Sequence, residues 1–155
     1  MRGWLVDTDV IAALIAPNGA PSVKKWAREA DEADLFISVL TLAEYDKGIA
    51  NLPAGDANAL RHAAARDALE ARFSGRILSL GDAVVRSWAT ISGRVKRETG
   101  HAPPVIDTLL AATAIAKGLY LVTRNAKDVA QSGAIVFDPW RNAAADFPVS
   151  RFGRG

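Results

Sequence analysis

Two carboxylates stand where the first apolar run of the chain ends, in the segment LVDTDVI at residues 5–11. An aspartate at the end of a buried strand costs free energy unless a cation, a hydrogen-bond network or a reaction uses its charge. Further oxygen-bearing side chains follow later apolar runs or lie early in helices: Glu44, Asp107 and Asn125. Carboxylate and amide oxygens suit Mg²⁺ or Mn²⁺, which leave positions open for water and phosphate. These residue types therefore indicate metal-assisted chemistry on a phosphate group, with Asp7 as the leading candidate.

Short apolar strands that alternate with helices are predicted to bring these side chains together. Strands are predicted at residues 4–6, 35–38, 77–78, 119–122 and 134–137. Helices are predicted over 10–15, 20–30, 38–50, a segment ending near 73, a stripe at 84–95 closed by Gly100, and a segment from Pro103-Pro104 to Gly118. We expect an α/β fold, a three-layer α/β/α sandwich with a central, mostly parallel sheet of four to five strands. Ligands bind beyond the carboxyl ends of such strands, so the candidate residues would share that edge.

Each of these residues also has a local explanation. Glu44 closes the segment TLAE, which matches a helix capping box. Asp107 would favour the N-terminus of its helix through the macrodipole, and Asn125 suits a turn. Asp9 is predicted as an N-cap or a supporting group rather than a ligand. Asp7 is the hardest to explain locally, because the two residues after it are available to cap the helix.

The composition excludes several other kinds of site. The chain has no cysteine, which rules out disulfides, cysteine nucleophiles and thiolate zinc sites and suits a reducing cytosol. Its two histidines, His62 and His101, are not arranged as the pair that metal-free general acid–base chemistry on a phosphodiester would need. We expect no membrane-spanning segment and no signal segment, and hence a cytoplasmic protein.

The length predicts one domain, which we place at residues 1–140, followed by a basic tail over residues 141–155. A chain of 155 residues that is 50% hydrophobic is long enough for one core and too short for two. The formal net charge is +2, and residues 139–155 supply all of it (three minus one) through Arg141, Arg151, Arg154 and Asp146. The body is formally neutral, so nucleic acid would have to bind at a local basic patch. We expect the tail to be loosely ordered.

The candidate residues lie in segments that resemble the motifs of PIN-domain ribonucleases, and more narrowly the VapC-type toxins of bacterial toxin–antitoxin pairs. The first motif is LVDTDVI, and the second, SVLTLAEYDKGI at 38–49, has a strand-end serine and a threonine ahead of a helical glutamate and a glycine. The third and fourth are DTLLAATA at 107–114 and LVTRN at 121–125. The segment GAIVFDPW at 133–140 resembles the family's last strand. The motifs come in the family's order and cover nearly the whole chain.

Two positions depart from the family pattern. Asp9 stands where asparagine or serine is commoner, and Asn125 stands where many relatives carry a fourth aspartate. An asparagine at that position lowers the negative charge available to a second metal ion.

The resemblance implies a toxin-like, metal-dependent endoribonuclease that hydrolyses RNA phosphodiester bonds. Its catalytic residues would be Asp7, Glu44, Asp107 and Asn125, of which the three acids would hold Mg²⁺ or Mn²⁺, directly or through water. Asn125 and Thr123 would complete the metal shell. Beside the fourth motif, Thr123, Arg124 and Lys127 are candidates for binding the substrate. Lys47 and the run RVKRE at 94–98 are weaker candidates, and a solvated helix face is the simpler explanation of that run.

The resemblance also implies partners. A cognate antitoxin would neutralise the enzyme, commonly by placing a peptide with an arginine in the acidic edge, and two copies would form a homodimer. The apolar stripes around Trp26 and Trp88 fit either the core or such a dimer interface.

Two other functions remain open. The segment DTDV at 7–10 also fits the first motif of haloacid-dehalogenase-type phosphotransferases, with Asp7 as the nucleophile and Asp9 as the acid/base. That chemistry needs a lysine and a later acidic pair at a strand end, whereas the fourth strand here ends in Thr123-Arg124-Asn125. The non-enzymatic alternative is a module that holds RNA or a protein at this edge without cutting.

Overall fold

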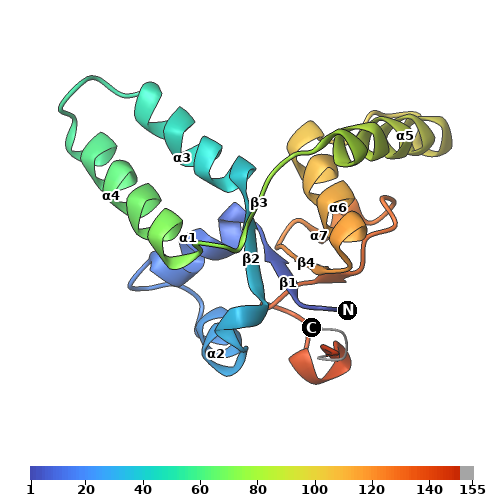
Figure 1. The fold of residues 1–155 in the computed structure, drawn as a ribbon, viewed down its shortest axis with the longest axis horizontal. Coiled ribbons are helices and arrows are strands. Elements are labelled where there is room, and N and C mark those ends of the chain that lie inside the picture. Colours follow the sequence, from blue (N-terminus) through green and yellow to red (C-terminus); the bar gives the residue numbers. More distant parts are fainter. Residues whose placement is uncertain (151–155) are drawn as a thin grey trace.

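Five short parallel strands form the centre of the computed structural model, which describes residues 1–150 (Figure 1). They are β1 (Trp4–Val6), β2 (Leu35–Ser38), β3 (Ile77–Leu78), β4 (Tyr120–Val122) and β5 (Val136–Phe137). Their order across the sheet is β3-β2-β1-β4-β5, and every pair is parallel. The central strand β1 thus pairs with β2 on one side and β4 on the other. The direction of strand addition reverses at β1, which makes its carboxyl end the natural binding position of such a sheet.

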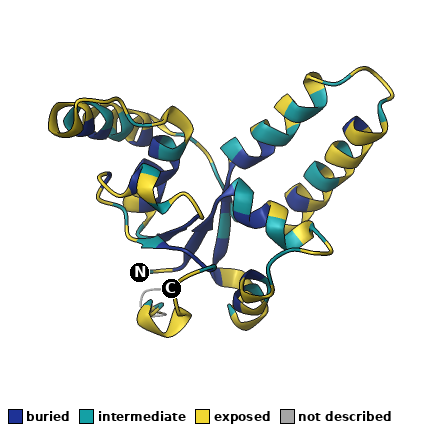
Figure 2. Cartoon of the chain, turned by 180° about the vertical axis from the view of Figure 1, so that it is seen from behind, coloured by how far each residue is buried: buried dark blue, intermediate teal, exposed yellow. Residues whose placement is uncertain are grey.

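Helices cover both faces of the sheet, as the predicted three-layer α/β/α sandwich requires (Figure 2). The α-helices are α1 (Thr8–Ile15), α2 (Pro21–Glu29), α3 (Val39–Ala50), α4 (Ala57–Arg72), α5 (Asp82–Thr99), α6 (Val105–Lys117) and α7 (Ala126–Val129). Short 3₁₀ turns occupy Glu32–Asp34 and Ala144–Asp146.

A hydrophobic core lies on each face of the sheet, and successive residues of β1 point to one core and then the other, because side chains of a strand alternate between its two faces. Trp4 and Val6 pack with residues of α1, α2 and the end of α4. Leu5, which is fully buried, packs instead with Leu110 and other residues of α6. The central strand therefore belongs to both cores at once and leaves no free face.

Two pairs of helices extend from the sheet on either side of the carboxyl edge (Figure 1). One pair is α3 with α4, and the other is α5 with α6. The stripe of α5 contributes Val84, Ile91 and Val95 to a buried cluster with Ala112 of α6, and Trp88 packs partly buried against it. Trp26 is 5% exposed and lies in the main core, so both tryptophans contribute to packing within this chain.

The first helix begins two residues earlier than predicted, at Thr8, because Asp7 caps it. Helix α7 was not predicted, since four residues are too few to show a helical period. Within residues 1–150, no helix has both the length and the apolar character needed to cross a bilayer.

Residues 141–150 of the predicted tail pack against the sheet. The Phe147 ring lies 4.9 Å from the Phe137 ring, and the Tyr120 hydroxyl donates to the Pro148 carbonyl at 2.7 Å. Arg151 and Arg154 lie outside the described residues. The prediction that this end of the chain is loosely ordered therefore stays a prediction. The boundary at residue 140 between a catalytic domain and a tail stays a prediction.

We expect Gly3→Ala to lower the free energy of unfolding by about 1–3 kcal/mol. A Cβ at Gly3 would lie 2.4 Å from the carbonyl oxygen of Asp34, so the β1–β2 pair would have to open. The matched control is Gly81→Ala, because a Cβ there meets nothing within 4 Å and its φ of −79° suits alanine. Urea unfolding of both variants measures the difference, and equal midpoints would contradict the close approach at Gly3.

Candidate active site

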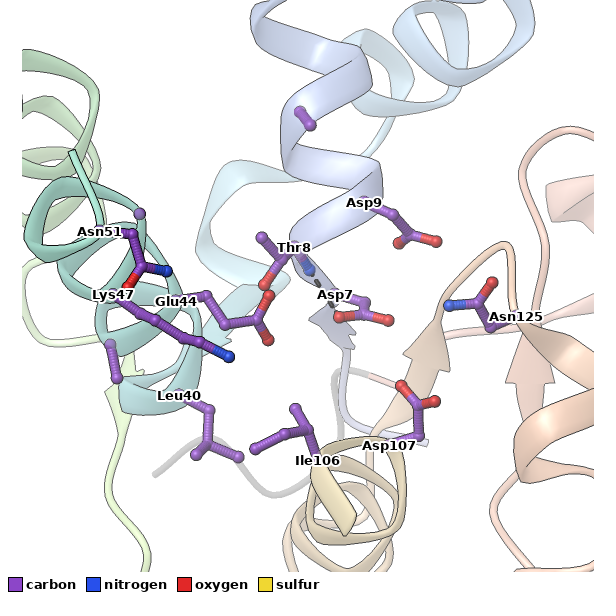
Figure 3. A pocket seen from close by; sticks show the side chains of 13 residues that line it. Asp7, Thr8, Asp9, Leu40, Glu44, Lys47, Asn51, Ile106, Asp107 and Asn125 are labelled. Atoms are coloured by element: carbon purple, nitrogen blue, oxygen red, sulfur yellow. Dashed lines mark hydrogen bonds between the residues drawn. The ribbon is translucent and has the colours of Figure 1, made fainter. Parts of the chain in front are cut away.

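A pocket of about 740 Å³ opens at the carboxyl edge of the sheet, between α1, α3 and α6 (Figure 3). Side chains from four separate parts of the chain line it. The predicted catalytic residues are all among them: Asp7, Glu44, Asp107 and Asn125. Asp9, Lys47 and Asn51 also line the pocket. Residues more than 100 positions apart in the sequence thus face one space.

Asp7 is fixed from two directions. Its side chain is 6% exposed, and its two carboxylate oxygens accept hydrogen bonds from the Thr8 backbone N–H at 2.6 Å and from the Thr123 hydroxyl at 2.8 Å. Asp7 is therefore the N-cap of α1, which corrects the expectation that its neighbours would cap this helix. The Thr123 hydroxyl points to Asp7, and its side chain is buried at 1% exposed.

Asp9 is the second residue of α1 and not its N-cap, which corrects the predicted capping role. One of its oxygens accepts a hydrogen bond from the Arg124 backbone N–H at 3.2 Å. Its Oδ1 atom is buried and has no hydrogen-bond partner within residues 1–150. Figure 3 shows its carboxyl group directed into the pocket, on the side of Asn125.

Glu44 lies in the second turn of α3, with its carboxyl group directed into the pocket (Figure 3). The N-cap of α3 is Ser38, whose hydroxyl accepts from the Leu40 backbone N–H at 3.0 Å. The capping-box explanation of Glu44 is therefore wrong, because the box requires its glutamate three residues after the cap.

Asp107 lies in the first turn of α6, after a proline N-cap that offers no side-chain hydrogen bond. Its carboxyl group and the Asn125 amide face the same part of the pocket as Asp7 (Figure 3). Asn125 occupies the N-cap position of α7 without a side-chain capping bond. Its amide is thus free of the local role that a turn residue would have.

Asp128 is an acid of this region that sequence reasoning missed. It lies on α7, and its negative charge raises the pKa of Asp107 more than any other neighbouring charge does. Its position three residues after Asn125, just beyond a strand end, could have indicated that it lies near the same edge of the sheet. It was missed because a four-residue helix is too short to show a helical period in the sequence.

The pKa values of the four acids that line the pocket, Asp7, Asp9, Glu44 and Asp107, are raised. Burial is the largest cause for Asp7, whose pKa rises to about 6 although its hydrogen bonds oppose the change. Burial and the Asp7 charge raise the pKa of Asp9 to about 6. Burial, with smaller effects of neighbouring carboxylates, also raises the pKa of Glu44 and of Asp107. The pocket therefore concentrates negative charge that a cation would relieve.

The donor set fits a hard divalent cation. It consists of carboxylate and amide oxygens, and one buried oxygen of Asp9 lacks a partner. Within residues 1–150, however, no three acidic or histidine side chains stand close enough to chelate one ion between them. An ion here would be held by one or two carboxylates with water at the remaining positions, as Mg²⁺ commonly is.

The remaining candidates are dispersed. The Arg124 guanidinium lies over the Trp140 ring, 4.9 Å from its centre, and Lys127 lines a second cavity with His101. Lys47 lines the main pocket (Figure 3). His62 is on α4 beside Tyr45, away from His101, so the structure pairs no histidines for catalysis.

Residues 4–131 match the sequence model of the PIN domain. The chain belongs to the PIN-domain family. The family resemblance and the fold class predicted from the motifs are both confirmed, and the pocket residues from Asp7 to Asn125 lie inside the matched region.

Similar proteins match this PIN-domain chain over most of its length. Toxin FitB of Neisseria gonorrhoeae is 29% identical over 138 residues, which span 89% of this chain and 99% of FitB. VapC ribonuclease Y4jK of Sinorhizobium fredii is 27% identical over 139 residues, spanning 90% and 99%. A solved structure of FitAB bound to an IR36 DNA fragment aligns with a TM-score of 0.80 at 28% identity, covering 90% of this chain and 97% of that chain.

We expect Asp7→Asn to raise the free energy of unfolding at pH 7 by about 3 kcal/mol in the presence of a chelator. The folded state holds the Asp7 proton up to a pKa of about 6, whereas the unfolded state releases it near 3.8. Between these two pH values the folded state binds more protons than the unfolded state, so the free energy of unfolding of the wild type falls as pH rises. Asparagine does not ionise, so the Asp7→Asn variant does not lose this stability.

Urea unfolding at pH 4, 6 and 7 measures this difference, with Asp146→Asn as an exposed control. The Asp7→Asn variant should gain stability relative to wild type as pH rises, and the control should not. A variant that is less stable than wild type by the same amount at each pH would show that Asp7 is not strained by burial.

Proposed function

We propose that this PIN-domain protein is a toxin-like endoribonuclease that depends on a divalent metal ion. The observation that carries the proposal is the convergence of Asp7, Glu44 and Asp107 on one pocket at the carboxyl end of the central strand. Its likeness to a protein named as a toxin and another named as a VapC ribonuclease, over about nine tenths of the chain, supports the same activity.

Of the carboxylates of Asp7, Glu44 and Asp107, one or two would hold Mg²⁺ or Mn²⁺ directly, and the others would hold it through its bound water. When bound, such an ion lowers the pKa of a bound water and offsets charge on the phosphoryl oxygens. Asp7 is already fixed by Thr8 and Thr123, so little of its freedom would be lost on binding. The Lys47 amine lines the pocket beside Glu44, on the same helix, and would contact a phosphate.

The same pocket is suited to control by a protein partner. The concentrated negative charge would attract an arginine side chain, which a cognate antitoxin would supply. One relative is named toxin FitB, and the solved structure named FitAB aligns with this chain at 28% identity; both support an antitoxin partner for the chain. We infer that the active form is a homodimer in the cytoplasm.

The phosphotransferase alternative is less favoured by the end of β4. That chemistry needs an acidic pair at a strand end, and β4 is followed instead by Thr123, Arg124 and Asn125. The acids that face Asp7 across the pocket, on α3 and α6, fit shared cation binding better than a lone nucleophile.

We expect Glu44→Gln to reduce RNA cleavage about 100-fold or more, since the charge stabilisation that a held metal provides is worth several kcal/mol. The matched control is Asp46→Asn on the same helix, because Asp46 points away to an ion pair with Arg66 at 2.6 Å. The measurement is cleavage of cellular RNA at increasing Mn²⁺, with new 5′ ends sequenced, beside growth after induced expression.

Wild type and Asp46→Asn should be toxic and should produce the same discrete cuts, and Glu44→Gln should do neither. Retained RNA binding with no cleavage at any Mn²⁺ concentration would identify a binding module instead. A phosphoaspartyl intermediate trapped on Asp7 would identify a phosphotransferase.

A further inference from the structure

A second cavity, of about 180 Å³, lies beside the catalytic pocket. The two spaces share the first turn of α6 and the start of α7. Asp107 and Asn125 line the catalytic pocket, whereas Thr108 and Asp128 line the second cavity. A ligand that crosses this short boundary would reach both spaces at once.

Hydrogen bonds within the chain hold the walls of this cavity in place. The Arg94 guanidinium donates to the carbonyl oxygens of Gln131 and Ser132, each at 3.0 Å. On the opposite wall, the Thr108 hydroxyl donates to the Pro104 carbonyl at 2.6 Å. The Thr99 hydroxyl donates to the Val95 carbonyl at 2.8 Å and accepts from the His101 backbone N–H at 3.3 Å, which ties the loop before α6 to the end of α5. The cavity is therefore formed before any ligand arrives.

The cavity has an apolar floor and a polar rim. Ile91 and Val95 form the floor and are 7% and 6% exposed. The rim carries the side chains of His101, Lys127 and Gln131, all of which are exposed. Within residues 1–150, no hydrogen bond or ion pair engages these three side chains. An apolar floor with a few unengaged polar groups is the usual form of a small-ligand site.

We propose that this cavity is a nucleotide subsite, which takes one unstacked base of a single-stranded RNA next to the phosphate that is cut. The inference rests on the proposed ribonuclease function. The base would lie on the apolar floor against the His101 ring, and Lys127 would contact the adjoining phosphate. Asp128 would accept a hydrogen bond from an amino group of the base.

The charges favour RNA over a protein segment in this cavity. Lys127 at the rim attracts a phosphate and repels the arginine that suits the acidic pocket next to it. Asp128 lies within electrostatic reach of Asp107, so a base in the cavity would have its phosphate near the catalytic acids. Single-stranded RNA supplies both groups in the required order, an anionic backbone beside a flat base.

The test compares RNA substrates with and without the base. A synthetic single-stranded oligonucleotide spanning a cut mapped in cellular RNA is made intact, and then with one abasic ribose at each position flanking the cut. The cavity is blocked by Ala102→Phe, which adds a ring at an exposed lining residue. His101→Ala removes the stacking partner without adding bulk. Ala130→Phe is the matched control, exposed and adjacent to Gln131 but outside the lining.

Wild type and Ala130→Phe should lose about tenfold or more in kcat/KM when the base at one flanking position is removed. Ala102→Phe and His101→Ala should cut the intact substrate about as slowly as wild type cuts the abasic one, with no further loss on the abasic substrate. The subsite would be ruled out if wild type cleaves RNA and both variants lose as much kcat/KM as wild type does when the base is removed. The ribonuclease function would then still stand. No cleavage by wild type at any Mn²⁺ concentration would instead remove the proposed function.

A third outcome concerns a protein occupant. Sedimentation of the full chain, alone and with its antitoxin, reports whether Ala102→Phe disrupts an assembly. A variant that keeps its base dependence but loses an assembly would show that the cavity takes a protein side chain, and this result would overturn the proposal.

Discussion

Burial of the Asp7 carboxylate at the end of the central strand is the constraint on which the rest of the site depends. The backbone N–H of Asp7 still donates to Val122 of β4 at 2.9 Å, so the residue is part of the sheet as well as the cap of α1. The Thr123 hydroxyl then holds its side chain from the neighbouring strand. These bonds compensate only part of the cost of burying a charge, because the pKa still rises to about 6. The fold thus keeps a strained anion where a cation would relieve it.

The topology explains why other acids gather around this anion. The sheet is extended from β1 in both directions, so the helix after β2 and the helix before β4 both have their N-terminal turns at the same edge. Glu44 and Asp107 lie in those turns. Repulsion between these carboxylates lowers the stability of the fold. Burial of apolar side chains in the two cores that share β1 offsets this loss. A site of this kind is a common example of stability given up for function.

The sequence was sufficient to predict the edge of the sheet at which the acids lie, because strands alternating with helices force parallel pairing and parallel strands share their carboxyl end. It was not sufficient for the local roles. Asp7 caps α1 and Asp9 does not, since the capping residue depends on the backbone angles where the strand ends. The Thr123 hydroxyl turns to Asp7 because β4 lies beside β1, a pairing that residue types alone do not reveal. Asp128 and the cavity beside it depend on how α5, α6 and α7 pack, which a short helix without a period conceals.

We expect a divalent cation to relieve the negative charge that this pocket concentrates. The free energy of unfolding at pH 7 measures this effect, in urea with increasing Mg²⁺ and with sodium chloride at matched ionic strength. Mg²⁺ should stabilise the wild-type chain in a saturable way, sodium chloride should not, and the gain should be lost in Asp107→Asn. An equal response to both salts, or an undiminished gain in Asp107→Asn, would show that the pocket does not bind the cation.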